Sequence, residues 1–168
     1  MNPTDGGADA AEILIGEDER GTVIRAVGHI RANESYVLRE EILPGLDGPS
    51  PKDYFVDLSG CSFMDSTFIG LLVAADKKLS RSCGRRMRIF NPAPGCAAAL
   101  KRLGLEKILH METGVLKLPA RMRALKKSGK PGAEFILKTH EALMETSAEA
   151  KKQFGLVMEL LAKKLRGK

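Results

Sequence analysis

The sequence predicts an α/β domain with a mostly parallel sheet of four or five strands, helices packed on that sheet, and a helical C-terminal extension. Short apolar runs alternate with longer segments in which apolar residues recur every three or four positions, as in βαβ units. The charge is divided unevenly, because residues 1–118 hold 15 Lys and Arg against 16 Asp and Glu, whereas residues 119–168 hold 12 against 5. This asymmetry indicates a boundary near residue 118.

This boundary and the local composition together predict that the chain is divided into four parts. Residues 1–9 are small and polar and are expected to be a disordered N-terminus. Residues 10–118 would form the α/β domain, residues 119–132 a basic linker, and residues 133–168 the helical extension. The apolar fraction of 43% is ample for a packed core.

The first part of the domain is expected to hold a hairpin and a helix. Apolar segments at residues 11–15 and 22–27 flank a charged turn, which suits two short strands. Asn33 or Ser35 would then cap a helix that ends near Ile42, before a loop rich in proline and glycine. The inner side of this helix would carry Tyr36, Val37, Leu38 and Ile42.

The centre of the domain is predicted from a strand and the helix that follows it. Residues 54–58 form a near-continuous apolar run, which is typical of a central strand covered on both faces. After a short polar turn, a helix is expected over residues 66–82, with Gly84 at its end. Its buried face would carry Phe68, Leu71, Leu72, Ala75 and Leu79. Its outer face would carry Asp76, Lys77, Lys78 and Arg81.

A further strand and helix complete the predicted domain. Residues 86–90 alternate in polarity and predict a strand, and Pro94 begins a short helix that Gly104 ends. Strands that alternate with helices imply parallel neighbours. Sites in such sheets lie at the carboxyl ends of the strands. Ser66 follows the central strand at such an end, which makes it a candidate functional residue.

Asp65, Ser66 and Thr67 stand where the central helix is expected to begin. Short hydroxyl and carboxylate side chains there satisfy the amides that lack intrahelical partners, and the partial positive charge of this helix end favours an anion. Ser66 is therefore either an N-cap or a place where a phosphoryl group can sit without melting the helix. Asp65 would cap the helix or orient the serine hydroxyl, and Asp57 would satisfy amides in the loop.

Several motifs occur in an order that resembles STAS domains, the anti-sigma factor antagonist fold. The strongest is the run Phe63-Met64-Asp65-Ser66-Thr67 followed by Ile69-Gly70-Leu71-Leu72. The supporting segments are residues 28–31, 38–42, 57–59, 87–92 and 100–108. The resemblance covers roughly residues 10–118 and implies a STAS fold for the domain.

The resemblance also implies a regulatory serine. In that family the first hydroxyl residue after the aspartate is the phosphorylation site, which here is Ser66, with Thr67 as a second candidate. The unphosphorylated form binds a kinase that is also an anti-sigma factor, and phosphorylation releases it. The implied partner-binding surface comprises Ser62, Met64, Asp65, Ser66, Thr67 and Phe68.

Phe68 departs from the family pattern, which has glycine at this position. Glycine leaves space beside the serine for the partner's nucleotide site, whereas a phenyl ring fills that space or turns into the core. Helical spacing with Leu71, Leu72 and Ala75 favours the core. An exposed Phe68 would instead be a hydrophobic anchor for the partner. A rise in phosphorylation when Phe68 is replaced by glycine would show that the ring obstructs the partner kinase.

Two classes of function remain open. The first is a non-catalytic, cytoplasmic signalling module that binds a kinase-type anti-sigma partner and is switched by phosphorylation at Ser66. The alternative is a phosphorylation-independent scaffold, or an accessory subunit of an ABC transporter or signalling complex, in which the helical tail mediates assembly. A third class, nucleotide binding, lacks a phosphate-cradling glycine loop. Enzymatic activity is not expected, because no nucleophile–base–orienter pattern is visible.

Other chemistry receives little support from the sequence. An odd number of cysteines without a CxxC motif predicts reduced thiols at Cys61, Cys83 and Cys96. The histidines show no ligand spacing, so no metal ion or cofactor is expected. The absence of tryptophan argues against nucleic-acid binding by stacking. No apolar run approaches the roughly 20 residues of a membrane span, and no signal peptide is recognisable.

Two helices are expected in the extension, over residues 133–145 and from the capping-box sequence at residues 146–149 to about Leu165. The second helix carries an apolar stripe of Phe154, Val157, Met158, Leu161 and Leu165. Such a stripe must be buried against something. The candidates are the domain's sheet, a second copy of the chain in a homodimer, or another protein.

Overall fold

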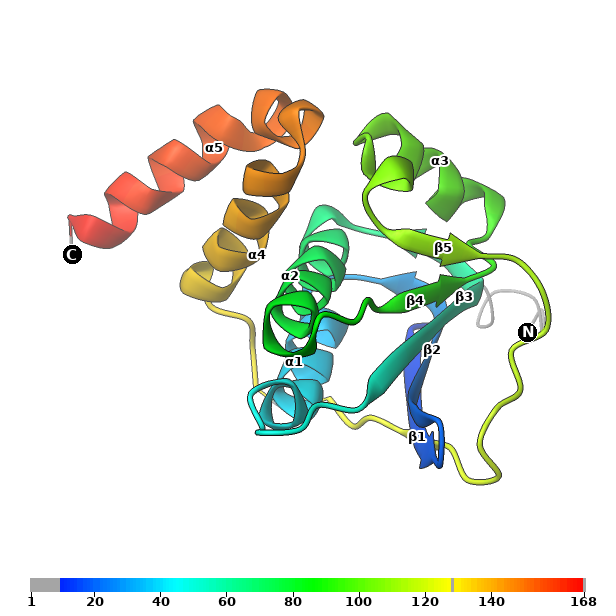
Figure 1. The fold of residues 1–168 in the computed structure, drawn as a ribbon. Helices are drawn as coiled ribbons and strands as arrows, with labels where there is room; N and C mark the ends of the chain where they lie inside the picture. The colour runs from blue at the N-terminus through cyan, green and yellow to red at the C-terminus, as the bar shows by residue number, and fades with distance from the viewer. Residues whose placement is uncertain (1–9, 128, 168) are drawn as a thin grey trace, which may run out of the picture.

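The computed structural model describes residues 10–127 and 129–167, so the predicted disorder of residues 1–9 lies outside the described residues. Within these ranges, none of the helices has the length and apolar character needed to cross a membrane. The described chain forms a sheet with helices on one face and a helical pair beside them (Figure 1).

Six strands of the described chain form one sheet in the order β5-β4-β3-β2-β1-β6. They are β1 (Glu12–Asp18), β2 (Gly21–Ile30), β3 (Asp53–Met64), β4 (Arg88–Phe90), β5 (His110–Glu112) and β6 (Arg123–Ala124). β1 runs antiparallel to β2 and to β6, and the other neighbours are parallel. The predicted mostly parallel sheet is confirmed, although it is mixed and has one strand more than expected.

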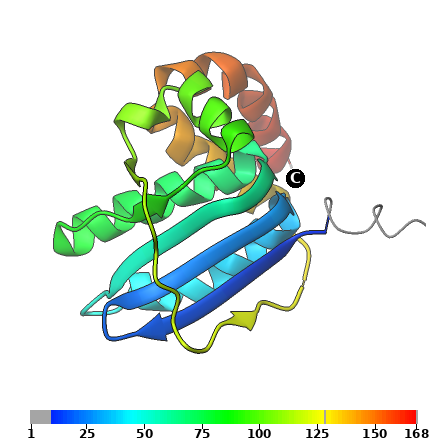
Figure 2. The ribbon, with the colours of Figure 1, turned by 90° about the vertical axis from the view of Figure 1, so that its right-hand side faces the viewer.

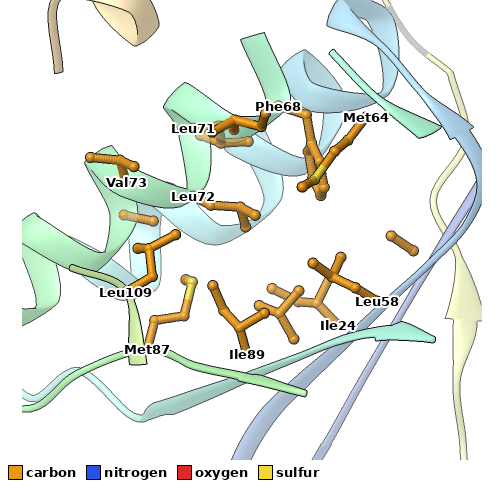
Figure 3. Close-up of a cluster of buried hydrophobic side chains, with 14 of the residues drawn as sticks. Ile24, Leu58, Met64, Phe68, Leu71, Leu72, Val73, Met87, Ile89 and Leu109 are labelled. Carbon is orange, nitrogen blue, oxygen red and sulfur yellow. The ribbon is translucent and has the colours of Figure 1, made fainter. Parts of the chain in front are cut away.

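The core lies between this sheet and two helices, α1 (Ala32–Leu46) and α2 (Ser66–Cys83), which cover one face (Figure 2). Figure 3 shows Phe68 and Leu72 of α2 facing Ile24, Leu58 and Ile89 of the sheet. The prediction of α2 is confirmed, and Gly84 ends it in the left-handed conformation with φ of 73°. A third helix, α3 (Pro94–Arg102), and a 3-10 turn, η1 (Leu105–Lys107), follow β4.

The opposite face of the sheet is crossed by the segment between β5 and β6, as Figure 2 shows. Side chains of the three central strands form a small apolar cluster with that segment. Its members are Val23, Phe55, Phe90, Leu116, Leu118 and Met122. β3 is therefore covered on both faces, as its apolar run predicts.

β3 is longer than its apolar run predicts. It continues from Leu58 through the expected polar turn to Met64, because β2 extends alongside it and pairs as far as Ile30. Two irregularities in register accommodate the longer strand. Only Asp65 then separates β3 from Ser66, the first residue of α2, so the junction between them is short instead of a loop.

α1 also extends beyond its predicted end. It reaches Leu46 with Pro44 inside its last turn, where few helical hydrogen bonds remain to be disturbed. Its fully buried apolar residues are Leu38, Ile42 and Leu46, spaced by four. Tyr36 and Val37, expected on the inner side, are only half-buried.

The prediction that Asp76 lies on the outer face of α2 is wrong. Asp76 is only 4% exposed, and its carboxylate accepts a hydrogen bond from the backbone N–H of Met87 at 2.9 Å. The Arg86 guanidinium donates to the same carboxylate at 2.6 and 3.1 Å. Asp76 thus ties the turn before β4 to α2, an interaction that helical spacing alone does not reveal.

The basic segment expected to be a linker contributes β6, which pairs with β1 at the edge of the sheet. Just after it, the backbone N–H of Leu125 donates to the carbonyl of Ile13 at 2.8 Å. This pairing protects an edge whose backbone groups would otherwise be available to another chain. Sequence reasoning missed β6 because two residues of strand carry no periodicity.

The tail forms two helices, α4 (Ala133–Thr146) and α5 (Ala148–Arg166), close to the predicted bounds. Ser147 caps α5 by accepting from the N–H of Ala150 at 3.0 Å, whereas the capping-box form places Thr146 in that role. α4 lies beside α2, and α5 packs on α4 and extends away from the domain (Figure 1). The tail therefore buries the inner face of α4 against α2, while α5 contacts α4. The expectation that the whole α5 stripe is buried is wrong, because Met158 is buried but Val157 is 59% exposed.

Candidate functional site at the start of helix α2

Ser66 is the first residue of α2, at the carboxyl end of β3. The N-cap of the helix is Asp65, whose carboxylate accepts a hydrogen bond from the N–H of Phe68 at 2.9 Å. Asp65 thus performs the capping that a hydroxyl could otherwise perform. The interpretation of Ser66 as an N-cap is wrong, and its hydroxyl is left to make a different contact.

That contact is with the tail. The Oγ of Ser66 lies 2.8 Å from Nε2 of His140, on the inner face of α4. The other ring nitrogen, Nδ1, lies 2.7 Å from the carbonyl oxygen of Ile136, which can only accept. In the neutral ring Nδ1 therefore carries the hydrogen, and Nε2 accepts from the serine hydroxyl. His140 is 4% exposed, so the hydroxyl is held inside a helix–helix contact.

A glycine allows this contact to form. Gly70 lies one turn after Ser66, and a Cβ built there would stand 2.4 Å from the backbone oxygen of Thr139 on α4. Real Cβ atoms do not approach a carbonyl so closely, so any larger residue at position 70 would push α4 away. Sequence reasoning treats Gly70 as part of a family motif, and the structure assigns it a packing role.

The ionisation of Asp65 is shaped by the same surroundings. Burial raises the pKa of its carboxyl group, because the charged form loses water. Hydrogen bonds from the backbone amides of Phe68, Ala32 and Thr67 lower it and only partly offset this effect. Burial therefore outweighs the hydrogen bonds in setting the pKa of Asp65.

The six residues predicted to form a partner-binding surface fall into two groups. Met64, Thr67 and Phe68 are buried, at 4%, 5% and 0% exposure, so their side chains offer little surface to a partner. Asp65 and Ser66 are half-buried, and Ser62 is exposed. Phe68 is thus a core residue, as its helical spacing predicts, and not an exposed anchor (Figure 3).

Near Ser66, the sequence places Phe63 in the expected surface loop without giving it a role, and it gives no role to His140. Phe63 is 44% exposed, and its ring contacts that of His29 while the Arg31 guanidinium lies 5.5 Å from its centroid. It sits beside Ser62 at the end of β3 and forms an exposed aromatic patch. His140 could have been suspected from the sequence, because it interrupts the apolar face of α4 between Phe135 and Leu143.

The remaining candidate groups are dispersed. All three cysteines are free, with Cys61 and Cys96 buried and Cys83 exposed. The Cys96 thiol donates to the carbonyl of Cys61 at 3.1 Å. Within residues 10–127 and 129–167, no group of three or more His, Cys, Asp or Glu side chains could hold a metal ion.

Solved structures with this fold include anti-sigma factor antagonists. The unphosphorylated form of SpoIIAA is 21% identical over 61% of this chain and 89% of that chain, with a TM-score of 0.52. SpoIIAA from Bacillus in its phosphorylated form is 21% identical over 61% of this chain and 91% of that chain, with a TM-score of 0.53. An anti-sigma factor antagonist from Mycobacterium paratuberculosis is 22% identical over 61% of this chain and 86% of that chain, with a TM-score of 0.52.

Similarity at these identities establishes the fold and no more. Among curated proteins, no match is found. Residues 13–113, which span β2 to β5 and all of β1 except Glu12, match the family model described as "Mlab, STAS domain". The α4–α5 tail lies outside the matched region. The chain belongs to the STAS domain family.

Proposed function

We propose that this protein is a non-catalytic signalling module of the cytoplasm that binds a protein partner and is switched by phosphorylation of Ser66. The partner would be an anti-sigma factor with serine-kinase activity. The observation that carries the proposal is the position of Ser66, whose hydroxyl stands at the first residue of α2 within a STAS fold. SpoIIAA, which shares this fold, has been solved in phosphorylated and unphosphorylated forms.

Electrostatics supports a switch at this position. A phosphoryl group adds about −1.5 to −2 charge, and a helix N-terminus tolerates that charge because of its partial positive end. A partner packed against the serine would have to desolvate the same charge and would be released. The exposed surface available to such a partner consists of Ser62 and Phe63, flanked by His29 and Arg31.

A second candidate function is a phosphorylation-independent assembly subunit. It is favoured by the contact between Ser66 and His140, because a hydroxyl held under α4 is shielded from a kinase. In this case the tail would mediate assembly through α5, whose exposed face carries Leu156, Val157 and Leu160. The inner face of α4 is already occupied within the chain, so it would not serve a homodimer.

Phosphate occupancy in cells distinguishes the two candidates. We expect mass spectrometry of the tryptic peptide spanning residues 53–77 to show phosphate on Ser66 in part of the protein. Thr67 is 5% exposed and is expected to stay unmodified. A peptide without phosphate under every growth condition would favour the assembly function.

Charge at position 66 should also decide partner capture. A Ser66→Asp variant is expected to fold but to retain about a tenth or less of the partner captured by the unmodified chain, because a charged group at a packed interface must be desolvated. Ser66→Ala should retain the partner. The control is Ser50→Asp, which adds the same charge in an exposed loop near the C-terminal part of α2 and away from Ser66. Equal capture by all three variants, quantified by affinity purification, would remove the switch.

A further inference from the structure

The contact between α4 and α2 is a helix docked on the surface around Ser66. The residues of α4 that it buries are Phe135, Thr139, His140 and Leu143. Gly70 provides the notch in α2 into which the backbone of Thr139 fits. The Lys77 ammonium of α2 also lies 3.2 Å from the carboxylate of Glu145. The surface that carries the proposed switch is thus occupied by the chain's own tail.

Contacts beyond α2 help to hold the tail. At one end of α4, Phe135 packs edge-on against Tyr36 of α1, with ring centroids 5.5 Å apart. At the other end, the hydroxyl of Ser147 donates to the carbonyl of Leu103 at 2.5 Å.

The connection between β6 and α4 has the composition of a tether, because it contains three lysines, two glycines and a proline. The tail can therefore leave the surface while remaining attached to the domain.

A phosphoryl group on Ser66 is incompatible with the docked position of α4. The 2.8 Å between Oγ and Nε2 is a single hydrogen-bond length and leaves no space for a phosphorus atom with three further oxygens. The phosphate would also lie next to the carboxylate of Asp65, which repels it. Phosphorylation further removes the hydroxyl hydrogen that His140 accepts. The lack of space and the loss of the hydroxyl hydrogen both act directly on the contact between Ser66 and α4.

We propose that α4 is a displaceable cover of a helix-binding surface on α2, and that phosphorylation of Ser66 expels it. This inference rests on the proposed function of Ser66 as a phosphoacceptor. In the unphosphorylated protein α4 occupies the surface and restricts access to Ser66. In the phosphorylated protein α4 leaves this surface, and the part of α2 around Ser66 and Gly70 becomes exposed. The α4–α5 tail, which lies outside the region matched by the family model, would thus have a regulatory role.

The test is hydrogen exchange of the full-length chain, measured by mass spectrometry. Phosphoserine is installed at position 66 through an expanded genetic code, and Gly70→Ala is prepared as a variant that clashes with α4 without touching Ser66. In both proteins the amides of α4 are expected to exchange at least about tenfold faster, because the helix opens without global unfolding. The amides of β2 and β3 should exchange as they do in the unmodified chain.

The matched control is Gly155→Ala in α5. A Cβ at Gly155 meets nothing within 4 Å, so this variant has the same change in helix propensity as Gly70→Ala without the clash. Its α4 amides should exchange no faster than those of the unmodified chain. Should Gly70→Ala also expose β2 and β3, His140→Ala replaces it, with faster exchange confined to α4 as the supporting result.

The proposal is overturned if α4 keeps its protection in the phosphoserine protein, including the case in which a doubly protonated His140 binds the phosphate and holds α4 in place. This outcome is separate from failure of the proposed function. The installed phosphate requires no cellular kinase, so hydrogen exchange reports whether phosphate displaces α4 in any case. A Ser66 that carries no phosphate in cells would contradict the proposed function and would leave the exchange result unaffected.

Discussion

Replacement of Phe68 by alanine is expected to lower the free energy of unfolding by about 3–5 kcal/mol, the usual cost of removing a phenyl ring from a core. The Phe68 ring is fully buried between α2 and the sheet and lies beside Met64 (Figure 3). Phe68 belongs to the main buried apolar cluster, and the packed residues around it relax only partly into the cavity left behind. Urea unfolding followed by circular dichroism measures the change.

The matched control for this prediction is Phe63→Ala. Phe63 precedes Phe68 by five residues and is 44% exposed. Its ring contacts the ring of His29 and the guanidinium of Arg31. Its loss is expected to cost about 1 kcal/mol or less. Similar unfolding curves for the two variants would show that the Phe68 ring does not fill the core.

The buried ring also changes what a glycine at position 68 would test. On the sequence interpretation, a rise in phosphorylation of Ser66 in the Phe68→Gly variant would show that the ring obstructs a kinase. In the structure the ring points into the core, so removing it opens a cavity under α2 and adds about 1 kcal/mol of helix cost for glycine. Any gain in phosphorylation would then reflect partial unfolding of the domain.

Replacement of Asp76 by alanine is the second large effect, with an expected loss of about 2–3 kcal/mol in the free energy of unfolding. The carboxylate is 4% exposed and accepts from the buried N–H of Met87, which the variant would leave without a partner. The ion pair with Arg86 contributes less, because the arginine side chain is 42% exposed and water screens it.

Asp47→Ala provides the comparison. Asp47 also forms an ion pair with a residue of α2, Lys78, but its side chain is 52% exposed. Its loss should cost less than about 1 kcal/mol. Chemical unfolding of both variants under one set of conditions separates the buried carboxylate from the exposed one, and equal losses would contradict the role given to Asp76.

Local sequence signals were sufficient for most of the domain. The helix α2 begins and ends within one residue of its prediction, because its cap, its apolar periodicity and Gly84 all act over a few positions. The bounds of β3 required its neighbour, since residues 59–64 are not an apolar run and become a strand only through pairing with β2. The buried state of Asp76 likewise depends on a turn ten residues further along the chain.

The candidate site shows the same division. The sequence by itself placed Ser66 at the start of a helix after a strand, because capping by Asp65 involves an amide only three residues away. Tertiary structure decided what the serine hydroxyl contacts, since His140 lies 74 residues later on a separate helix. That pairing depends on how two helices cross, and the crossing depends on the absence of a side chain at Gly70. Contacts over a few residues follow from composition, whereas contacts between helices follow from shapes that form only when the chain has folded.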